Sequence, residues 1–297
     1  MPRVKHLLAI AVALGCATFR DDTGWAPQPA GADADAKAQK AIDETWQAMG
    51  VLPTYKTYGE IRFTWNFTEN GALKKSESFY WNRFEHRMRW ESNTVEGDRI
   101  AVRVDLVKHT GKAFHAKRNV GGSAAGNQTQ SGQGVQGTNN ANLVQAAKFE
   151  PLPSSEFEHY QEPAVKSFVQ ARRWLIGPIN LRDPGVHVKF ETDVAGPDEK
   201  KYEALHVTFD ASADVDRKGD ELWWLLSPDT RLPSWMLWKQ EGHEGKSAWA
   251  LEEWKDVGGG LKLPTLYKQW GTQVVIQFAN VQANPRPEDE LYFESVH

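Results

Sequence analysis

The chain has 297 residues, with 35 Lys and Arg against 39 Asp and Glu, and a single cysteine. A formal net charge of −4 and the lack of a basic stripe argue against nucleic acid as a partner. One cysteine also excludes an internal disulfide. The 13 tryptophans, 13 phenylalanines and 7 tyrosines indicate a thick aromatic core, a lined cavity, or both.

Residues 1–15 have the layout of a signal peptide. Arg3 and Lys5 give a short positive start, and the run from Leu7 to Leu14 is purely apolar. That run is too short to span a bilayer, which needs about 20 apolar residues. The start of the chain therefore predicts export.

The cysteine, Cys16, follows directly after Gly15. This pair resembles a bacterial lipobox, in which the cysteine thiol is acylated and becomes the first residue of the mature protein. Ala13 departs from the pattern, because leucine is preferred there. We predict a lipid anchor at Cys16, with palmitate among its acyl chains, and Ala17 favours the outer membrane, facing the periplasm. The alternative is an ordinary signal peptide that leaves a soluble periplasmic or secreted protein.

A tether and a helix come next. Residues 16–33 are rich in Pro, Gly, Ala and Asp, which is typical of a linker. Residues 34–49 carry apolar side chains at helical spacing, and Gly50 is placed to end this helix. We predict that residues 34–297 form a single domain.

From residue 58 the apolar period changes to two, which predicts strands. Residues 61–67 alternate between apolar and polar side chains, and Asn70-Gly71 is a hairpin turn signal. Residues 78–92 are interpreted as one long strand, and residues 100–106 alternate in the same way. The pattern is typical of antiparallel strands with one solvated face.

The second half of the chain begins with an insertion and a helix. Residues 121–142 are rich in Gly, Gln and Asn, and we predict a flexible loop there. Residues 163–176 predict a helix with Pro163 in its first turn and Gly177-Pro178 at its end. Short strands with regular turn signals fill the rest. Together these patterns predict a mainly β fold, with a large curved antiparallel sheet covered by helices.

The order of the later segments carries a family resemblance. The stretch "LLSPDTRLPSWMLW" precedes "GLKLPT", and the last strand runs into Asn284, Asp289, Leu291 and Phe293. This order resembles the outer-membrane lipoprotein-sorting (LolA/LolB-like) superfamily, in its uncharacterised periplasmic lipoprotein branch. The resemblance covers roughly residues 34–293.

The resemblance implies a half-open, unclosed β-barrel of about eleven strands, with helices over its mouth. It also implies a hydrophobic cavity that takes acyl chains. The sequence departs from the family in its insertion at residues 121–142, and no arginine can be matched to the carrier's gating residue.

Large apolar side chains on the expected inward faces are the candidates for lining this cavity. The helix at residues 163–176 and the loop before it would act as a lid. Plain core packing explains the same side chains equally simply, because interior positions of a half-open barrel serve core and cavity together. The candidates are Trp65, Tyr80, Phe84, Trp90, Phe168, Trp224, Trp235, Leu237, Ile276 and Phe278.

No pattern of catalytic or metal chemistry stands out. His109 and His115 have no further ligand at metal-binding spacing beside them. A nucleophile elbow of the Gly-x-Ser-x-Gly type does not occur. Glu252 and Glu253 are adjacent, so on a strand they point to opposite faces. We expect no enzyme activity, no cofactor and no metal.

The expected function is that of a cell-envelope lipoprotein whose cavity binds lipid or lipoprotein acyl chains, as a carrier or an acceptor. The alternative is a structural or interaction lipoprotein with a filled barrel and no ligand. An envelope enzyme is a third possibility, and it would require polar groups that converge in the pocket. The expected partners are an acyl chain, the membrane through the anchor, and another envelope protein, with the chain itself a monomer.

Overall fold

The structure is a computed structural model that describes residues 36–54, 57–94, 97–117, 149–210 and 218–284. The predicted signal peptide, lipidated Cys16, tether and insertion at residues 121–142 lie outside these ranges. The same holds for Asp289, Leu291 and Phe293 of the predicted ending.

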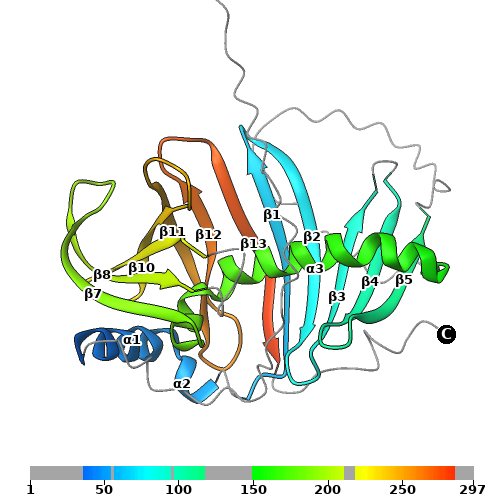
Figure 1. The fold of residues 1–297 in the computed structure, drawn as a ribbon, viewed down its shortest axis with the longest axis horizontal. Coiled ribbons are helices and arrows are strands. Elements are labelled where there is room, and N and C mark those ends of the chain that lie inside the picture. The colour runs from blue at the N-terminus through cyan, green and yellow to red at the C-terminus, as the bar shows by residue number, and fades with distance from the viewer. Residues whose placement is uncertain (1–35, 55–56, 95–96, 118–148, 211–217, 285–297) are drawn as a thin grey trace, which may run out of the picture.

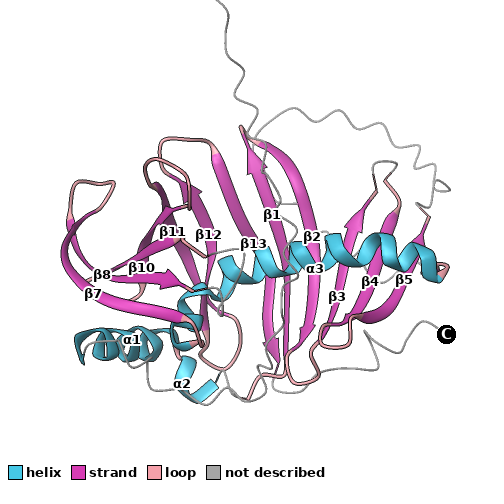
Figure 2. Ribbon diagram, in the orientation of Figure 1, coloured by secondary structure: helices cyan, strands magenta, loops and turns pink. Residues whose placement is uncertain are grey.

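The described residues form thirteen strands and few helices, and Figure 2 shows the contrast between the two classes. The helices are α1 (Ala36–Met49), α2 (Val51–Thr54), α3 (Ser154–Ile176) and the 3₁₀ helix η3 (Gly177–Arg182). The strands are β1 (Glu60–Glu69), β2 (Ala72–Asn82), β3 (Arg87–Asn93), β4 (Arg99–Asp105), β5 (Thr110–Ala116), β6 (Glu150–Pro151), β7 (Val186–Ala195), β8 (Lys201–Phe209), β9 (Glu221–Leu226), β10 (Pro233–Lys239), β11 (Ser247–Asp256), β12 (Lys262–Gln269) and β13 (Val274–Asn284).

All strands belong to one antiparallel sheet that does not close. Its order is β6-β5-β4-β3-β2-β1-β13-β12-β11-β10-β9-β8-β7, so the first and last long strands of the domain pair at its middle. The sheet curls around the helices on one side (Figure 1). The predicted mainly β, half-open architecture with covering helices is confirmed, with thirteen strands where about eleven were expected.

The predicted alternation holds in β1. Ile61, Phe63 and Trp65 are buried on one face, and the intervening residues are less buried. Asn70 and Gly71 both have positive φ, at 51° and 74°, which is the conformation that a tight hairpin turn requires.

The long strand predicted at residues 78–92 is instead a hairpin of β2 and β3. Asn82 causes the break, because its side-chain oxygen accepts the backbone N–H of Glu85 at 3.0 Å. His86 then adopts a positive φ of 53°. The turn reverses the chain, so Phe79 lies directly opposite Trp90, and Tyr80 falls on the other face.

Helices cover one face of the sheet, which we call the inner face, and the opposite face is the outer face. Helix α3 passes in front of β1 to β5 in Figure 1, and α1 lies beside the β7 end. Helix α1 buries the residues expected from its spacing, including Ile42, Trp46 and Met49. Helix α3 begins at Ser154, nine residues before the predicted start, so Pro163 lies inside it.

The main hydrophobic cluster lies between the inner face and the helices. Smaller clusters lie on the outer face, one at each half of the sheet. One contains Ala101, Phe114, Ala116 and Phe149. The other contains Ala204, Trp223, Leu225 and Leu237.

The two ends of the sheet differ from the strands between them. At one end, β6 has only two residues, and one of them is Pro151. At the other end, β7 carries exposed or half-buried charged side chains and loses its register with β8 between Glu191 and Val194. Within that bulge Asp193 has a positive φ of 57°.

Candidate functional site

Helix α3 places an aromatic ring against the centre of the inner face. Phe168 is fully buried, with its ring centroid 5.9 Å from that of Phe79 and 5.5 Å from that of Trp81, both on β2. Phe79 stacks on Phe63 of β1 at 5.0 Å, and Phe63 meets Phe278 of β13 at 5.9 Å. These rings form a continuous apolar floor beneath the middle of α3.

A second aromatic group fixes the C-terminal end of α3. The ring of Trp174 meets those of Trp249, Tyr267 and Trp238 at 4.7, 5.2 and 5.8 Å. The Tyr267 hydroxyl donates to the Trp174 carbonyl oxygen at 2.5 Å. Burial raises the pKa of Tyr267 well above its ordinary value, so this hydroxyl keeps its proton at neutral pH. This end of the helix is therefore firmly anchored.

The first half of α3 buries fewer side chains than the second half. Between Ser154 and Glu162 only Phe157 is buried, and it packs so closely that a Cβ added at Gly111 would lie 2.9 Å from its ring. Gln161 donates from its side-chain amide to the His109 carbonyl at 3.0 Å.

At the boundary of the two halves, Pro163 has no backbone N–H. It therefore cannot make the hydrogen bond of a regular helix to the carbonyl of His159. The helix can therefore bend at Pro163 while breaking fewer backbone hydrogen bonds than a bend elsewhere would break.

A polar group lies within the apolar floor, under the middle of α3. The Lys75 ammonium contacts the buried Glu77 carboxylate at 3.0 Å and donates to the Ser167 hydroxyl at 2.8 Å. The Ser167 hydroxyl in turn donates to Glu77. The Lys75 nitrogen also lies 4.9 Å from the ring centroid of Trp65. A charged pair at this depth needs its hydrogen bonds, and it ties α3 to β2.

Two indole N–H groups on the same inner face have no acceptor among the described residues. They belong to Trp65 on β1 and Trp90 on β3, whose side chains are 3% and 8% exposed. A buried donor without a partner costs about 1–3 kcal/mol relative to a satisfied one. Such groups therefore call for an explanation.

Three indoles of the other half of the sheet have acceptors for their N–H groups. The N–H of Trp46 on α1 donates to the Pro178 carbonyl at 3.1 Å. The N–H of Trp238 donates to Asp220 at 2.9 Å, and that of Trp249 donates to Ser247 at 3.1 Å. The N–H groups of Trp65 and Trp90 thus differ from those of these three indoles.

The structure brings part of the predicted lining set together. Those found in the main inner cluster are Trp65, Trp90, Phe168, Trp224, Ile276 and Phe278. Their role in binding remains a prediction, since burial in this cluster is also what core packing requires.

The other predicted lining residues lie elsewhere. Tyr80 is on the outer face opposite Arg89, because the turn at residues 83–86 changes the alternation. Phe84 is in that turn and is 43% exposed. Trp235 and Leu237 belong to the outer-face cluster of the β7 half. The predicted positions of these four on the inner face are therefore wrong.

Several inner-face rings were not in the predicted set. Phe63 was within reach of the sequence, because it alternates with Trp65 in β1. Phe79 and Trp81 take the inner positions that had been assigned to Tyr80 and its neighbours. Trp174 lies three residues after Ala171 in α3, so helical spacing was the signal that places it on the buried stripe.

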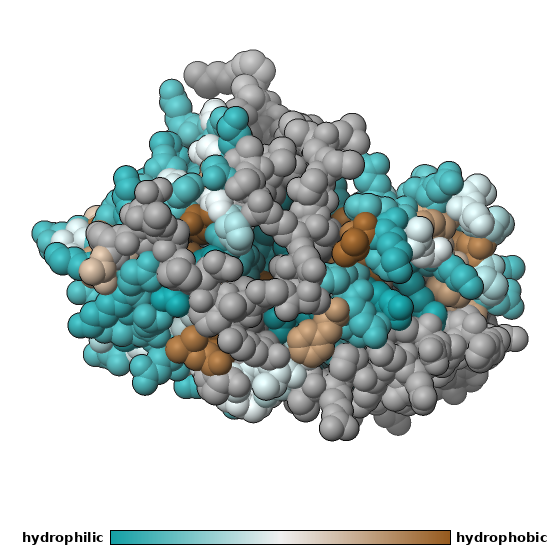
Figure 3. Space-filling view, turned by 60° about the horizontal axis from the view of Figure 1, so that its bottom comes forward, coloured by the Kyte–Doolittle hydropathy of each residue, from teal (hydrophilic) through white to brown (hydrophobic). Residues whose placement is uncertain are grey.

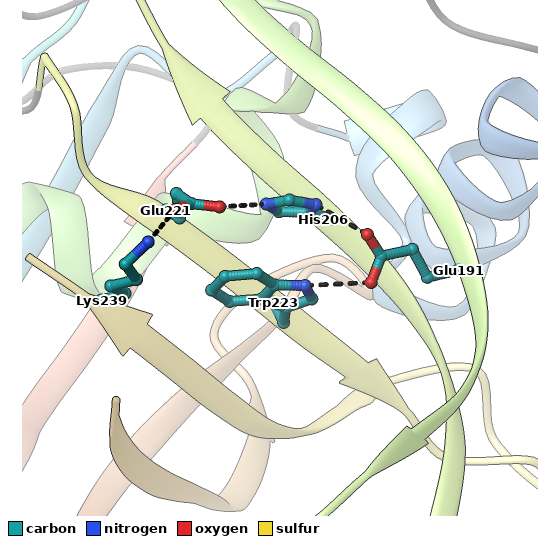
Figure 4. Close-up of polar contacts among 5 residues, drawn as sticks. All are labelled: Glu191, His206, Glu221, Trp223 and Lys239. Atoms are coloured by element: carbon teal, nitrogen blue, oxygen red, sulfur yellow. Dashed lines mark hydrogen bonds and ion pairs between the residues drawn. The ribbon is translucent and has the colours of Figure 1, made fainter. Parts of the chain in front are cut away.

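The outer face of the β7 half carries a network of charged side chains around His206 (Figure 4). One ring nitrogen of His206 lies 2.7 Å from Glu191, and the other lies 3.0 Å from Glu221. Both carboxylates accept hydrogen bonds, so the network is complete when both nitrogens carry a proton. The His206 ring stacks on Trp223 at 4.2 Å, and the Trp223 N–H donates to Glu191 at 3.1 Å.

Two lysines complete this network. The Lys239 ammonium donates to Glu221 at 2.6 Å. This hydrogen bond lowers the pKa of Glu221 below its ordinary value of 4.5. Lys246 places its nitrogen 3.3 Å from the ring centroid of Trp223, and burial there lowers the pKa of Lys246. The network covers Trp223, which explains why an indole on the outer face is almost fully buried.

The described surface in Figure 3 is mainly polar, with separate small apolar patches. None of the helices within the described ranges is long and apolar enough to cross a bilayer. Within the same ranges, no three His, Cys, Asp or Glu side chains are grouped so that they could hold a metal ion.

No family model matches this chain, and no curated protein sequence matches it. Solved structures with a similar fold include a DUF1329 family protein from Desulfovibrio piger, with 10% identity and a TM-score of 0.43, covering 87% of this chain and 98% of that one. A LolA superfamily protein from Nitrosomonas europaea has 11% identity and a TM-score of 0.36, covering 86% and 96%.

A third similar structure is an outer membrane lipoprotein-sorting protein domain from Vibrio parahaemolyticus, with 9% identity, a TM-score of 0.36, and coverage of 87% and 98%. Such distant likenesses concern the arrangement of elements, and function has to be inferred from this chain's own residues.

Proposed function

We propose that this protein is a cell-envelope lipoprotein that binds the acyl chain of a lipid or lipoprotein between the inner face and helix α3. The chain would be carried or accepted there without chemical change. The N-terminal signal pattern supports the envelope location, and the aromatic floor under α3 supports an apolar ligand.

One observation carries this proposal: the unpaired indole N–H groups of Trp65 and Trp90. A hydrocarbon alone would not use them, but the carbonyl oxygen at the head of an acyl ester or amide accepts this kind of hydrogen bond. Each bond made would remove a cost of about 1–3 kcal/mol from the ligand-free protein. The methylene groups would add about 0.8 kcal/mol each on burial.

The helix would make room for the ligand. Side chains under α3 form one buried cluster, so an acyl chain enters only if part of that cover moves. In the segment Ser154–Glu162, Phe157 is buried, Tyr160 packs against the main cluster and Gln161 makes a hydrogen bond to the turn before β5. The other end is anchored through Trp174. The bend at Pro163 would let the first half lift while the second half stays in place.

The first experiment looks for the ligand itself. The full-length protein is purified under mild conditions, and acyl species that co-purify are identified by mass spectrometry. After delipidation, binding is measured with diphenylhexatriene, a hydrocarbon dye, and with methyl palmitate, which carries an ester carbonyl. We expect both probes to bind. If no acyl species co-purifies and neither probe binds, the proposal is wrong, and the alternative of a structural or interaction lipoprotein without a ligand is favoured.

Matched substitutions separate the indole N–H groups from simple packing. Trp65→Phe and Trp90→Phe remove the N–H and keep an aromatic ring. We expect unchanged dye binding and about 5- to 10-fold weaker methyl palmitate binding, as the loss of one hydrogen bond predicts. Trp249→Phe is the control, because its side chain is similarly buried but already donates to Ser247.

The control also gives a stability comparison. Without ligand, Trp249→Phe is expected to be more destabilising than Trp65→Phe by about 1 kcal/mol, since only Trp249 loses a hydrogen bond that is already made. Equal losses of both probes in all three variants would mean that the N–H groups do not contact the ligand.

A further inference from the structure

A buried carboxylate lies beside the two indole N–H groups that have no acceptor among the described residues. Glu77 on β2 is directly opposite Trp65 on β1. Phe79, the next residue of β2 on the inner face, is directly opposite Trp90 on β3. Side chains in directly opposed positions are neighbours on one face of a sheet. Two hydrogen-bond donors and one carboxylate therefore border the same small area of the inner face.

The Glu77 carboxylate can accept a further hydrogen bond. The Ser167 hydroxyl donates to its oxygen Oε2, and the Lys75 ammonium lies 3.0 Å from the same oxygen. A carboxylate has about four acceptor positions on its two oxygens. The other oxygen, Oε1, can therefore accept from a ligand, although the side chain of Glu77 is only 4% exposed.

Lys75 contacts both the carboxylate and the indole. Its ammonium pairs with Glu77 and also lies 4.9 Å from the ring centroid of Trp65. The indole thus meets the cation with its ring, and its N–H makes no hydrogen bond to Glu77 even though the two residues are directly opposite. A donor on β1 and an acceptor on β2 are therefore both available to a third group.

The polarity of β2 changes along its inner face. The side chain of Lys75 is 38% exposed, Glu77 is buried and polar, and Phe79 and Trp81 are buried and apolar. A ligand with a polar head and a hydrocarbon tail has the same order of groups. Its head would lie beside Glu77, and its tail would follow Phe79 toward Trp81.

We propose that the acyl ligand is an amide, in which the chain is attached to nitrogen. This inference rests on the proposed acyl-chain function and narrows its ligand class. In a trans amide the C=O and the N–H point in opposite directions, so the carbonyl accepts from the Trp65 indole while the N–H donates to Oε1 of Glu77. An ester offers only the acceptor, and an ionised fatty acid also brings a negative charge toward Glu77.

The test compares probes that differ only at the head group. The full-length protein is delipidated, and displacement of diphenylhexatriene is measured with three palmitoyl compounds. N-methylpalmitamide has the N–H, whereas N,N-dimethylpalmitamide and methyl palmitate lack it. We expect N-methylpalmitamide to bind about 10-fold more tightly than either of the others, as one hydrogen bond to a charged group predicts.

A matched variant replaces both members of the ion pair, Lys75→Met together with Glu77→Met. Replacing both partners of a buried pair with apolar side chains of similar size is often nearly neutral for folding. We expect the advantage of N-methylpalmitamide to disappear while methyl palmitate binds as before. Comparing the ratio of affinities between wild type and variant cancels the different solubilities of the probes.

The control is Glu252→Met together with Lys268→Met, which removes an exposed ion pair of the same two residue types. This variant should keep the advantage of N-methylpalmitamide. Circular dichroism checks the fold of each variant. If the Lys75 and Glu77 double variant does not fold, Glu77→Gln replaces it, and the advantage should then fall about 3-fold because a neutral acceptor is weaker.

The outcomes separate this inference from the proposed function. If methyl palmitate binds but N-methylpalmitamide has no advantage, or keeps it in the Lys75 and Glu77 variants, the amide inference is wrong and the acyl-chain function still holds. If no probe binds, both are wrong.

The amide could belong to a lipid or to an acylated protein, since both present the same chemistry. Once the amide is shown to be preferred, N-palmitoylsphingosine and an N-palmitoyl tetrapeptide amide are compared as competitors for diphenylhexatriene. Tighter binding of the first supports a lipid as the source, and tighter binding of the second supports an acylated protein.

Discussion

The two halves of the sheet close their inner faces in different ways. In the β7 half, α1, η3 and the end of α3 form the cover, and Trp46, Trp238 and Trp249 all have acceptors for their N–H groups. In the β5 half, the cover is α3, and Trp65 and Trp90 have no acceptors among the described residues. The two halves thus differ in these indole groups, although the buried Thr45 hydroxyl of α1 also has no partner among the described residues.

The outer faces show a second difference. In the β7 half an apolar cluster is shielded by the network of His206, Glu191 and Glu221, in which opposite charges are paired. In the β5 half, Arg103 and Lys112 lie directly opposite each other.

The largest effect on stability is expected from Trp174→Ala, which removes the ring that packs the end of α3 against the β7 half. Trp174 joins α3 to three aromatic side chains of the sheet, and truncating such a ring costs about 3–5 kcal/mol in the free energy of unfolding. Urea denaturation measures the change. Trp270→Ala is the control, because that side chain is 57% exposed and its loss should cost about 0.5 kcal/mol. Similar costs for both would mean that α3 is not anchored at Trp174.

A smaller effect is expected from Gly111→Ala in the β5 half. A Cβ there would lie 1.9 Å from the Arg103 carbonyl oxygen and 2.9 Å from the Phe157 ring, so strand or helix must shift. We expect a loss of about 1–3 kcal/mol, with faster hydrogen exchange in residues 154–162.

A double-mutant cycle with Phe157→Ala shows how much of this loss acts through the helix. Unchanged hydrogen exchange in residues 154–162 would show that only the strand moves in response to the added Cβ. The first half of α3 would then keep its position on the sheet.

The smallest effect concerns acid stability and the His206 network. The pKa of Glu221 is lowered in the folded protein, mainly by the hydrogen bond from Lys239. Its contribution to stability is therefore present above pH 4.5, the ordinary value, and is lost as the pH falls through the lower, folded pKa.

Glu221→Gln should accordingly cost about 1 kcal/mol or less at pH 7, and the cost should disappear at a pH below the folded value. Thermal unfolding at a series of pH values measures this, with Glu252→Gln as the control for losing an exposed strand carboxylate. A cost that stays constant with pH would show that the charge of Glu221 is not responsible.

Much of the fold was predictable because its local signals are strong. Helix α1 follows its apolar spacing, and β1 keeps the alternation of Ile61, Phe63 and Trp65. The pair Asn70-Gly71 predicted the hairpin turn between β1 and β2, and both residues have the positive φ that this turn requires. The open curved sheet then follows from many short strands and few helices.

The errors arose where the sequence offers no local signal. The turn at residues 83–86 contains no Gly or Pro and depends on an Asn82 side chain, so the alternation appeared to continue through it. In "WWLL" and "WMLW" both faces are apolar, and β10 has a register shift before Trp235, so the sequence could not tell inside from outside.

The properties that distinguish the two halves depend on contacts between distant segments. Whether Trp65 finds an acceptor depends on which residues of β2, β13 and α3 lie around it. Similarly, the register of β4 and β5 places Arg103 directly opposite Lys112. Composition and periodicity contain neither fact.

The unclosed sheet has a consequence for self-association. A terminal strand with unpaired backbone groups is a template on which further chains can assemble, as they do in amyloid. Here one terminus of the sheet offers two residues including Pro151, and the other is interrupted by the bulge at Asp193 and lined with charge. Each terminus therefore offers only a short stretch of regular strand, which makes the addition of further chains at the sheet edges less favourable.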